Sequence, residues 1–353
     1  MMKLKHTLLA ASLLAAMSAQ AQTAFTVYGN ADIALNNDVK TATTGIKTEE
    51  TSVVPGGLST SNVGFRGERE IAKGLKATFQ MEFEVDQTTD SGIVKTRAGL
   101  VGLAGDFGAV TFGRRTTLAK VAIDFLDAND AANTAGFIGD NARDSRRNDM
   151  ITYSTPNFSG FSADVQLGLG SPTRITSAAG VVTQDGKSED SNSVGLNYTN
   201  GPLAVKWVND SIKNYSKSVS VAGYSVAVPT AMATRKNEAF GATYDLGFAK
   251  LYFVDTKLTQ GTVATLVTFD TQTLGVRAPM GKFTFVAEAG TGKAKLTNSA
   301  VKADVDALQL AVLYTLAKDT TLFGVYGTES IAHPTFVKKA DQKNTHFGIR
   351  YKF

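Results

Sequence analysis

Apolar and polar side chains alternate along several stretches of this chain, and this alternation limits the fold more than any other feature. From Lys76 to Asp86, every odd-numbered position between 77 and 85 is apolar and every even-numbered position is polar or charged. The last segment repeats the pattern, with apolar side chains at every second position from Phe347 to Phe353. A period of two residues is typical of a β-strand with one dry and one wet face. The chain is therefore predicted to be all-β.

The same signal recurs along the chain and predicts sixteen strands. Each segment is about as long as the 9 to 11 tilted residues that cross a bilayer, whereas no apolar run after residue 21 approaches the roughly 18 residues of a membrane helix. The predicted strands cover residues 24–34, 60–70, 75–86, 94–103, 108–115, 146–155, 160–169, 191–200, 202–210, 237–245, 248–257, 269–278, 281–290, 304–315, 320–328 and 344–353.

The connections between these strands alternate in length. The short ones use Gly, Pro, Asn or Asp turn chemistry and lie at 71–74, 104–107, 156–159, 201, 246–247, 279–280 and 316–319. The long ones are polar and rich in Gly and Thr, and lie at 35–59, 87–93, 116–145, 170–190, 211–236, 258–268, 291–303 and 329–343. Tight periplasmic turns and long outer loops are typical of a transmembrane barrel. Because an open sheet edge in hydrocarbon leaves backbone groups unpaired, the last strand is expected to pair with the first.

The charges on the polar face indicate that this face is the inside of the barrel. Lys76, Glu82, Glu84 and Asp86 occupy it at even-numbered positions, which suits a water-filled lumen. Aromatic residues lie on the apolar face close to strand ends, as in the interfacial girdles of membrane barrels, at Tyr153, Phe161, Tyr198, Trp207, Tyr244, Phe283 and Tyr351. The competing interpretation is a secreted soluble β-protein, which would have to bury the face around Phe79.

The N-terminus has the three parts of an export signal. Lys3 and Lys5 are followed by the apolar stretch Leu8–Met17 and by Ala19-Gln20-Ala21, the small-x-small pattern that signal peptidase reads. We expect cleavage after Ala21, so that residues 1–21 are a signal peptide and residues 22–353 form a single barrel domain.

Composition excludes several classes of function. The chain has no Cys, which excludes disulfides and thiolate metal sites. It has only three His, one of them in the predicted signal peptide, so few residues could serve as a general base near neutral pH. No nucleophile–base set stands out, and the formal net charge of +4 calls for no nucleic-acid partner. We therefore expect no enzyme, catalytic residue, metal or cofactor.

Several segments of the chain together have a distinctive order and spacing. They are Phe25–Asp32, Val63–Glu68 running into Gly74–Ala77, Gly99–Leu103, Phe107–Arg114 and Arg146 through Phe161, followed by the C-terminal Phe353. These segments resemble Gram-negative general porins of the β-proteobacterial type, as found in Burkholderiales and Neisseriales, and Phe353 resembles the signal read by the outer-membrane assembly machinery. The resemblance covers nearly the whole mature chain. It implies a homotrimer of sixteen-stranded antiparallel barrels in the outer membrane, each with its own pore constricted by an inward-folded third loop.

A sixteen-stranded barrel leaves an aqueous channel, so transport through it is diffusion past a charged constriction. We expect a basic wall of Arg66, Arg97 and Arg146, with Arg114 as a weaker candidate where strand parity breaks, facing acidic residues Asp124, Asp127 and Asp130 of the third loop. Many relatives have Arg where this chain has Asn62, which predicts a thinner basic wall. The alternative role of each arginine is a salt bridge to a neighbouring Glu that stiffens the wall.

The expected function is passive diffusion of ions and small hydrophilic solutes, with a preference for anions. The expected partners are outer-membrane lipid and lipopolysaccharide, the assembly machinery and the permeating solutes. Three other classes stay open: a more substrate-selective outer-membrane channel, a barrel whose loops mediate adhesion, and a barrel enzyme, for which the chain offers no organised catalytic set.

Overall fold

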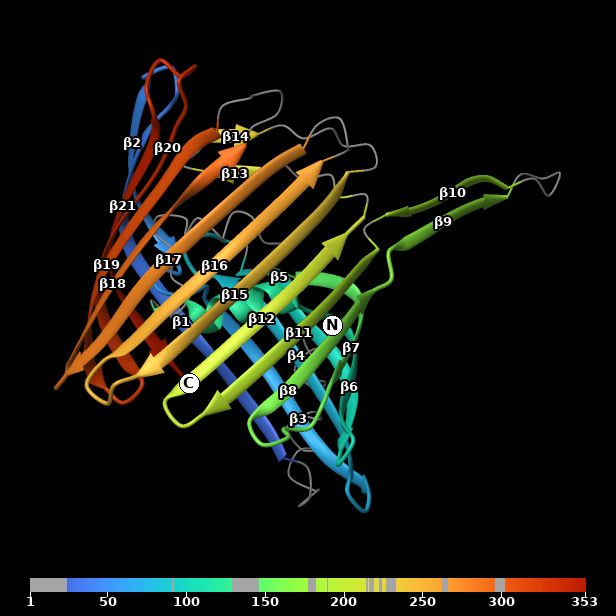
Figure 1. The fold of residues 1–353 in the computed structure, drawn as a ribbon. Coiled ribbons are helices and arrows are strands. Elements are labelled where there is room, and N and C mark those ends of the chain that lie inside the picture. Colours follow the sequence, from blue (N-terminus) through green and yellow to red (C-terminus); the bar gives the residue numbers. More distant parts are fainter. Residues whose placement is uncertain are drawn as a thin grey trace, which may run out of the picture.

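The strands of the chain curl into a closed barrel (Figure 1). This computed structural model describes residues 24–353 except 91, 129–145, 177–181, 189, 214, 216–218, 222–223, 227–232, 262–265 and 296–301. The predicted signal peptide lies outside the described residues. Within them, no helix is long and apolar enough to cross a membrane.

Sixteen antiparallel strands form the wall, which confirms the predicted number and order. They are β1 (Ala24–Thr41), β3 (Asn62–Ala72), β4 (Leu75–Asp86), β5 (Gly92–Gly105), β6 (Gly108–Thr116), β7 (Arg146–Ser154), β8 (Phe161–Gly168), β11 (Ser191–Asn200), β12 (Leu203–Ile212), β15 (Thr234–Asp245), β16 (Lys250–Gly261), β17 (Leu266–Met280), β18 (Phe283–Lys295), β19 (Lys302–Ala317), β20 (Thr320–Ala332) and β21 (Ala340–Lys352). The barrel closes where β1 pairs with β21, from Asn30 opposite Lys352 to Thr41 opposite Asp341.

The long connections contain hairpins that the sequence did not predict. Strand β2 (Lys47–Pro55) pairs with the outer half of β1, while β9 (Ser171–Thr176) pairs with β10 (Val182–Ser188) and β13 (Val219–Val221) with β14 (Tyr224–Val226). In Figure 1, β2 stands beside the upper parts of β20 and β21, and β9 and β10 extend outward from the barrel. A hairpin in water needs only backbone pairing, and a segment such as Lys47-Thr48-Glu49-Glu50 therefore shows no apolar period.

The two faces of the wall have the predicted polarity. Val101 and Leu274 on the outer face are 60% and 65% exposed, while Gln166 on the inner face is fully buried. The predicted aromatic residues also lie outward near the short turns, where Tyr153, Tyr244 and Tyr351 are exposed. An apolar exterior around a polar interior is the arrangement of a membrane barrel.

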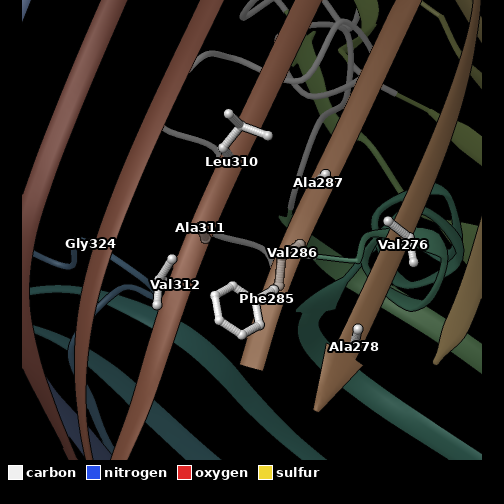
Figure 2. Close-up of a pocket in the computed structure, with 9 residues that line it drawn as sticks. All are labelled: Val276, Ala278, Phe285, Val286, Ala287, Leu310, Ala311, Val312 and Gly324. Carbon is white, nitrogen blue, oxygen red and sulfur yellow. The ribbon is translucent and has the colours of Figure 1, made fainter. Parts of the chain in front are cut away.

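Figure 2 shows part of this outer face over β17, β18 and β19. Small side chains between larger ones leave a shallow apolar depression of about 380 Å³, lined by Val276, Ala278, Phe285, Val286, Ala287, Leu310, Ala311, Val312 and Gly324. Because its lining is entirely apolar, this depression suits contact with hydrocarbon and is not part of the pore.

Two of the short turns depend on glycine. Gly74 has a φ of 72° and Gly201 a φ of 56°, and open space surrounds the position of a Cβ at both. Backbone conformation therefore fixes the residue type at these turns, since glycine adopts positive φ without steric cost.

The third long connection enters the barrel and forms helix α2 (Leu118–Leu126), which is drawn inside the strands in Figure 1. Thr117 caps the helix by accepting a hydrogen bond from the Lys120 N–H. The apolar face of α2 packs against Val208, Ala239 and Val254 on the inner wall. The inward-folded third loop is thus confirmed, and burial of one helix face holds it in the lumen.

Candidate pore constriction

The chain that follows α2 is fixed to the opposite wall by two polar side chains. The Ala128 N–H donates to Glu288 Oε1 at 2.6 Å, and Arg277 Nη1 donates to the Ala128 carbonyl oxygen at 3.0 Å. The loop therefore spans from the end of β6 to β17 and β18, and narrows the passage between these anchors.

Arg97 lies on the wall between two glutamates. Its Nε is 2.5 Å from Glu82 Oε1, and its Nη1 is 3.4 Å from Glu84 Oε2. Lys95 reaches the other oxygen of Glu84 at 3.1 Å. The basic wall at this level is therefore an interleaved set of two cations and two anions, as in the salt-bridge alternative that the sequence left open.

A β-bulge turns Arg97 into the lumen. Val101 and Leu103 point outward from β5, so strict alternation would send the odd-numbered Arg97 outward as well. The register shifts between Glu82, which pairs with Ala98, and Phe83, which pairs with Thr96, and leaves Arg97 as the extra residue. Arg97 faces the lumen as predicted, but the bulge rather than simple parity places it there.

Arg146, the first residue of β7, joins the same group of charges. It interacts electrostatically with Arg97, Glu82, Glu84 and Asp124. We call these five residues the constriction cluster. It combines the wall strands β4, β5 and β7 with helix α2, and so brings together two of the predicted basic residues and one of the predicted acidic residues.

Arg66 is connected to the constriction cluster through Tyr28. Its guanidinium carbon lies 5.1 Å from the centre of the Tyr28 ring. The Tyr28 hydroxyl donates to Glu82 Oε2 at 3.0 Å and accepts from Gln80 Nε2 at 2.6 Å. Arg66 pairs with Gln80, and Gln80 lies two residues before Glu82 on β4, which begins at the short turn. Arg66 is therefore two residues nearer the short-turn end of the pore than Glu82 is.

Arg114 does not join the constriction cluster. It donates to the Thr96 carbonyl at 2.7 Å and to Asn148 Oδ1 at 2.6 Å, and shares the parity of the outward Phe112. The next residue, Arg115, instead donates to Thr111 Oγ1 at 2.7 Å on the inner side. The register shifts between β6 and β7 beside Gly113, whose φ is 128°, but alternation along β6 still places Arg114 with the outer face and Arg115 with the inner face.

The three predicted loop acids have different positions. Asp124 lies on α2, where it pairs with Lys120 at 2.5 Å. Asp127 follows α2 as its C-terminal cap and is only 4% exposed, so it does not line open water. Asp130 lies outside the described residues.

Phe353 closes the chain against the first strand. Its N–H donates to the Gly29 carbonyl at 3.1 Å, and its own carbonyl accepts from the Gly29 N–H at 3.0 Å. Its ring stands 53% exposed beside Tyr351, with 6.3 Å between ring centres. The terminal residue thus completes backbone pairing at the seam between β1 and β21 and leaves its side chain accessible.

Sequence reasoning missed other charged residues of the inner wall. Lys206 and Lys250 approach the ring of Phe125 on α2. Arg147 forms a buried two-point ion pair with Asp210, at 2.9 and 2.7 Å. Alternation from the outward Trp207 places Lys206 and Asp210 inward, so this signal was available for both.

The arrangement suits electrostatic control of diffusion. Charges of both signs lie across a narrowed, water-filled passage, where they act on a permeating ion without any bond being made. Among the described residues, no group of three or more His, Asp or Glu side chains forms a metal-binding set.

Comparison with known proteins gives a consistent result. The family model for the Gram-negative porin matches residues 7–331. Outer membrane porin protein 32 of Delftia acidovorans is 30% identical over 91% of this chain and 88% of its own length. Among solved structures, an anion-selective porin from Comamonas acidovorans has a TM-score of 0.75 at 23% identity, covering 94% of this chain and all of its own. A trimer form of OmpT of Vibrio cholerae has a TM-score of 0.67 at 16% identity, with 94% and 100% coverage.

The last two similarities concern the fold, whereas the family match and the Delftia relative extend over nearly the whole sequence. Together with a closed sixteen-stranded wall and an inward loop, they identify the protein as a channel of the outer membrane. The chain belongs to the Gram-negative porin family.

Proposed function

We propose that this porin is a general diffusion channel that favours small anions. One observation carries the proposal: the described acids of the constriction cluster each have a cationic partner within ion-pair distance, whereas Arg146 has no carboxylate at that distance among the residues that the structure describes. Arg97 pairs with Glu82 and Glu84, and Lys120 with Asp124. Arg66, which contacts the Tyr28 ring, also has no carboxylate at that distance among the described residues. The uncompensated charge that the described residues bring to the passage is therefore positive.

A positive surplus in a narrow passage raises the local concentration of anions and lowers that of cations. Water surrounds the charges on the open side, so the effect is a preference and not an exclusion. The structurally similar porin from Comamonas acidovorans is anion-selective, which supports the same preference here. The long polar outer loops and the wide barrel fit passage of small hydrophilic solutes in general.

The remaining expectations concern assembly and location within the cell. We infer a homotrimer, supported by the trimer form of a porin with the same fold, and contact of the apolar exterior with outer-membrane lipid and lipopolysaccharide. We also infer that residues 1–21 direct export, that the accessible Phe353 side chain is read by the assembly machinery, and that the protein has no enzymatic activity. Membership of a channel family supports this last point.

The test is conduction in a planar bilayer. The purified protein should give discrete conductance steps, and its zero-current potential in a tenfold KCl gradient should have the sign set by chloride. Steps with a potential of the opposite sign would contradict the anion preference, and an absence of steps would contradict the channel. A sample in which the strands are unfolded, judged by heat-modifiable migration on a detergent gel, serves as the control.

A further inference from the structure

Two lysines converge on one aromatic ring at the short-turn side of α2. Lys206 Nζ lies 4.7 Å and Lys250 Nζ 5.2 Å from the centre of the Phe125 ring. All three side chains are partly exposed, so they meet both the protein and the water of the lumen. We propose that Lys206 and Lys250, arranged around Phe125, form a second anion site that binds small multivalent oxyanions such as inorganic phosphate. This inference rests on the proposed function and adds a site to it.

The register places both lysines inside the barrel. Lys206 on β12 has the parity of Val208, which packs against α2, and is opposite Gly241. Lys250 is the first residue of β16, directly after the short connection that follows β15. The pair therefore lies between α2 and the short-turn mouth, on the wall where α2 packs, while Arg97 belongs to β5 on another part of the wall.

The surroundings leave the two positive charges largely unneutralised. Within the described residues, neither ammonium group has a carboxylate at ion-pair distance. Lys206 donates to Asn197 Oδ1 at 2.7 Å and is attracted electrostatically by Asp164. The Asp164 oxygens are already bonded, to the Ser154 hydroxyl at 2.5 Å and the Asn197 amide at 2.9 Å.

Lys250 has even less compensation. Its ammonium group lies near two rings, those of Phe125 and Tyr252, both at 5.2 Å. A cation–π contact attracts an ammonium group but uses none of its hydrogen-bond donors. Arg115, which also interacts electrostatically with Asp164, adds a further positive charge to the inner wall. An oxyanion bound between the lysines would accept charge-assisted hydrogen bonds from both and relieve their repulsion.

A purely structural role for the lysines makes a different prediction. If they only hold Phe125, and with it α2, then an uncharged side chain of similar length should preserve most of the packing, because lysine stems and methionine both cover apolar surface. Replacement by methionine therefore separates charge from packing. The readout is phosphate binding, which packing alone would not change.

The experiment measures chloride current through single channels in KCl while potassium phosphate is added at constant ionic strength. The native porin should show a saturable decrease in current, stronger when phosphate is added from the short-turn side. The K206M/K250M double variant should need about tenfold more phosphate for the same decrease, since it loses two charge-assisted bonds. K206R/K250R should retain the decrease.

Lys282→Met is the matched control. This lysine is also at the short-turn end and lies 5.9 Å from a ring centre, that of Tyr314, but it is exposed and lies in the turn between β17 and β18. Its loss should leave the phosphate effect unchanged. If the double methionine variant fails to assemble, the single Lys250→Gln variant, at the first residue of its strand, gives the same comparison.

The outcomes separate this site from the channel itself. Equal phosphate sensitivity in the native and K206M/K250M proteins would overturn the site, as would a native channel that conducts chloride with no response to phosphate, and either result leaves the proposed channel intact. A native protein that forms no conductance steps would overturn the proposed function and the site together.

Discussion

The guanidinium group of Arg147 binds both carboxylate oxygens of Asp210 inside the barrel wall, at 2.9 and 2.7 Å. The side chains are 5% and 0% exposed, and the Asp210 carboxylate also accepts hydrogen bonds from Ser193 and Asn237. The pair joins β7 to β12 across two intervening strands. A link of this kind resists ovalisation of the barrel beside the constriction.

Breaking this pair should destabilise the barrel strongly. Arg147→Met leaves a buried carboxylate without its cation, and such a change typically costs about 3–5 kcal/mol. This loss is measured as the difference in the free energy of unfolding in urea between the native protein and the variant, with unfolding followed by gel mobility. Lys293→Met removes an exposed ion pair with Asp304 on the outer face and should cost less than about 1 kcal/mol. Equal losses in the two variants would refute the distinction.

Loosening the contact between α2 and the wall should disturb the current. Leu126 is 1% exposed and lies against Gly241, where an added Cβ would come within 2.6 Å of its Cδ1 atom. Leu126→Ala removes packing worth about 2–5 kcal/mol and should raise open-channel noise. Val121→Ala, on the 41% exposed side of the same helix, should not. Noise that stays at the native level in Leu126→Ala would show that α2 is held by other contacts.

Neutralising the basic wall should reverse the selectivity. Replacement of Arg66, Arg97 and Arg146 together by Gln leaves Glu82 and Glu84 without the Arg97 partner, so the local charge becomes negative. The chloride-to-potassium permeability ratio should fall several-fold, and the zero-current potential in a KCl gradient should shift toward cations. Arg114→Gln is the control, because Arg114 shares the parity of the outer face. An unchanged potential in the triple variant would remove these residues from the selectivity site.

The terminal residue allows two roles to be separated. Deleting Phe353 removes both its backbone pairing with Gly29 and its ring, whereas Phe353→Ala removes only the ring. If the exposed ring is the assembly signal, both variants should leave unassembled protein in the periplasm, as measured by cell fractionation. Phe347→Ala, which truncates another exposed ring of β21, should assemble normally. Normal trimer yield from Phe353→Ala would assign the role to backbone closure instead.

The alternation in the sequence was sufficient for the wall and its polarity. At Met81 and Gln80, for example, the outward and inward directions follow directly from the period of two. Along β6 the same rule also places Arg114 with the outer face, but along β5 it would send Arg97 outward, and a bulge turns Arg97 into the lumen instead. Bulges depend on how two strands pair, and a single strand's sequence does not record its partner's register.

The interior of the pore was less predictable for a related reason. Asp127 looks like any loop acid in the sequence, yet it is buried because α2 ends against the wall there. Lys206 and Lys250 are 44 positions apart and meet only through Phe125, a residue of a third element. Tertiary contacts that depend on where a helix docks leave no local pattern.

The seam between β1 and β21 also bears on how such a chain reaches its folded form. Asp38 and Gln342, which meet across it, are separated by 304 positions. The barrel cannot close until β21 has been synthesised and exported. Until then, the edge of β1 that pairs with β21 has no partner strand. Long-range closure of this kind is slow and exposes an edge that invites mispairing with other chains. Chaperones that cover unpaired strands would therefore determine the yield of assembled protein more than the stability of the closed barrel does.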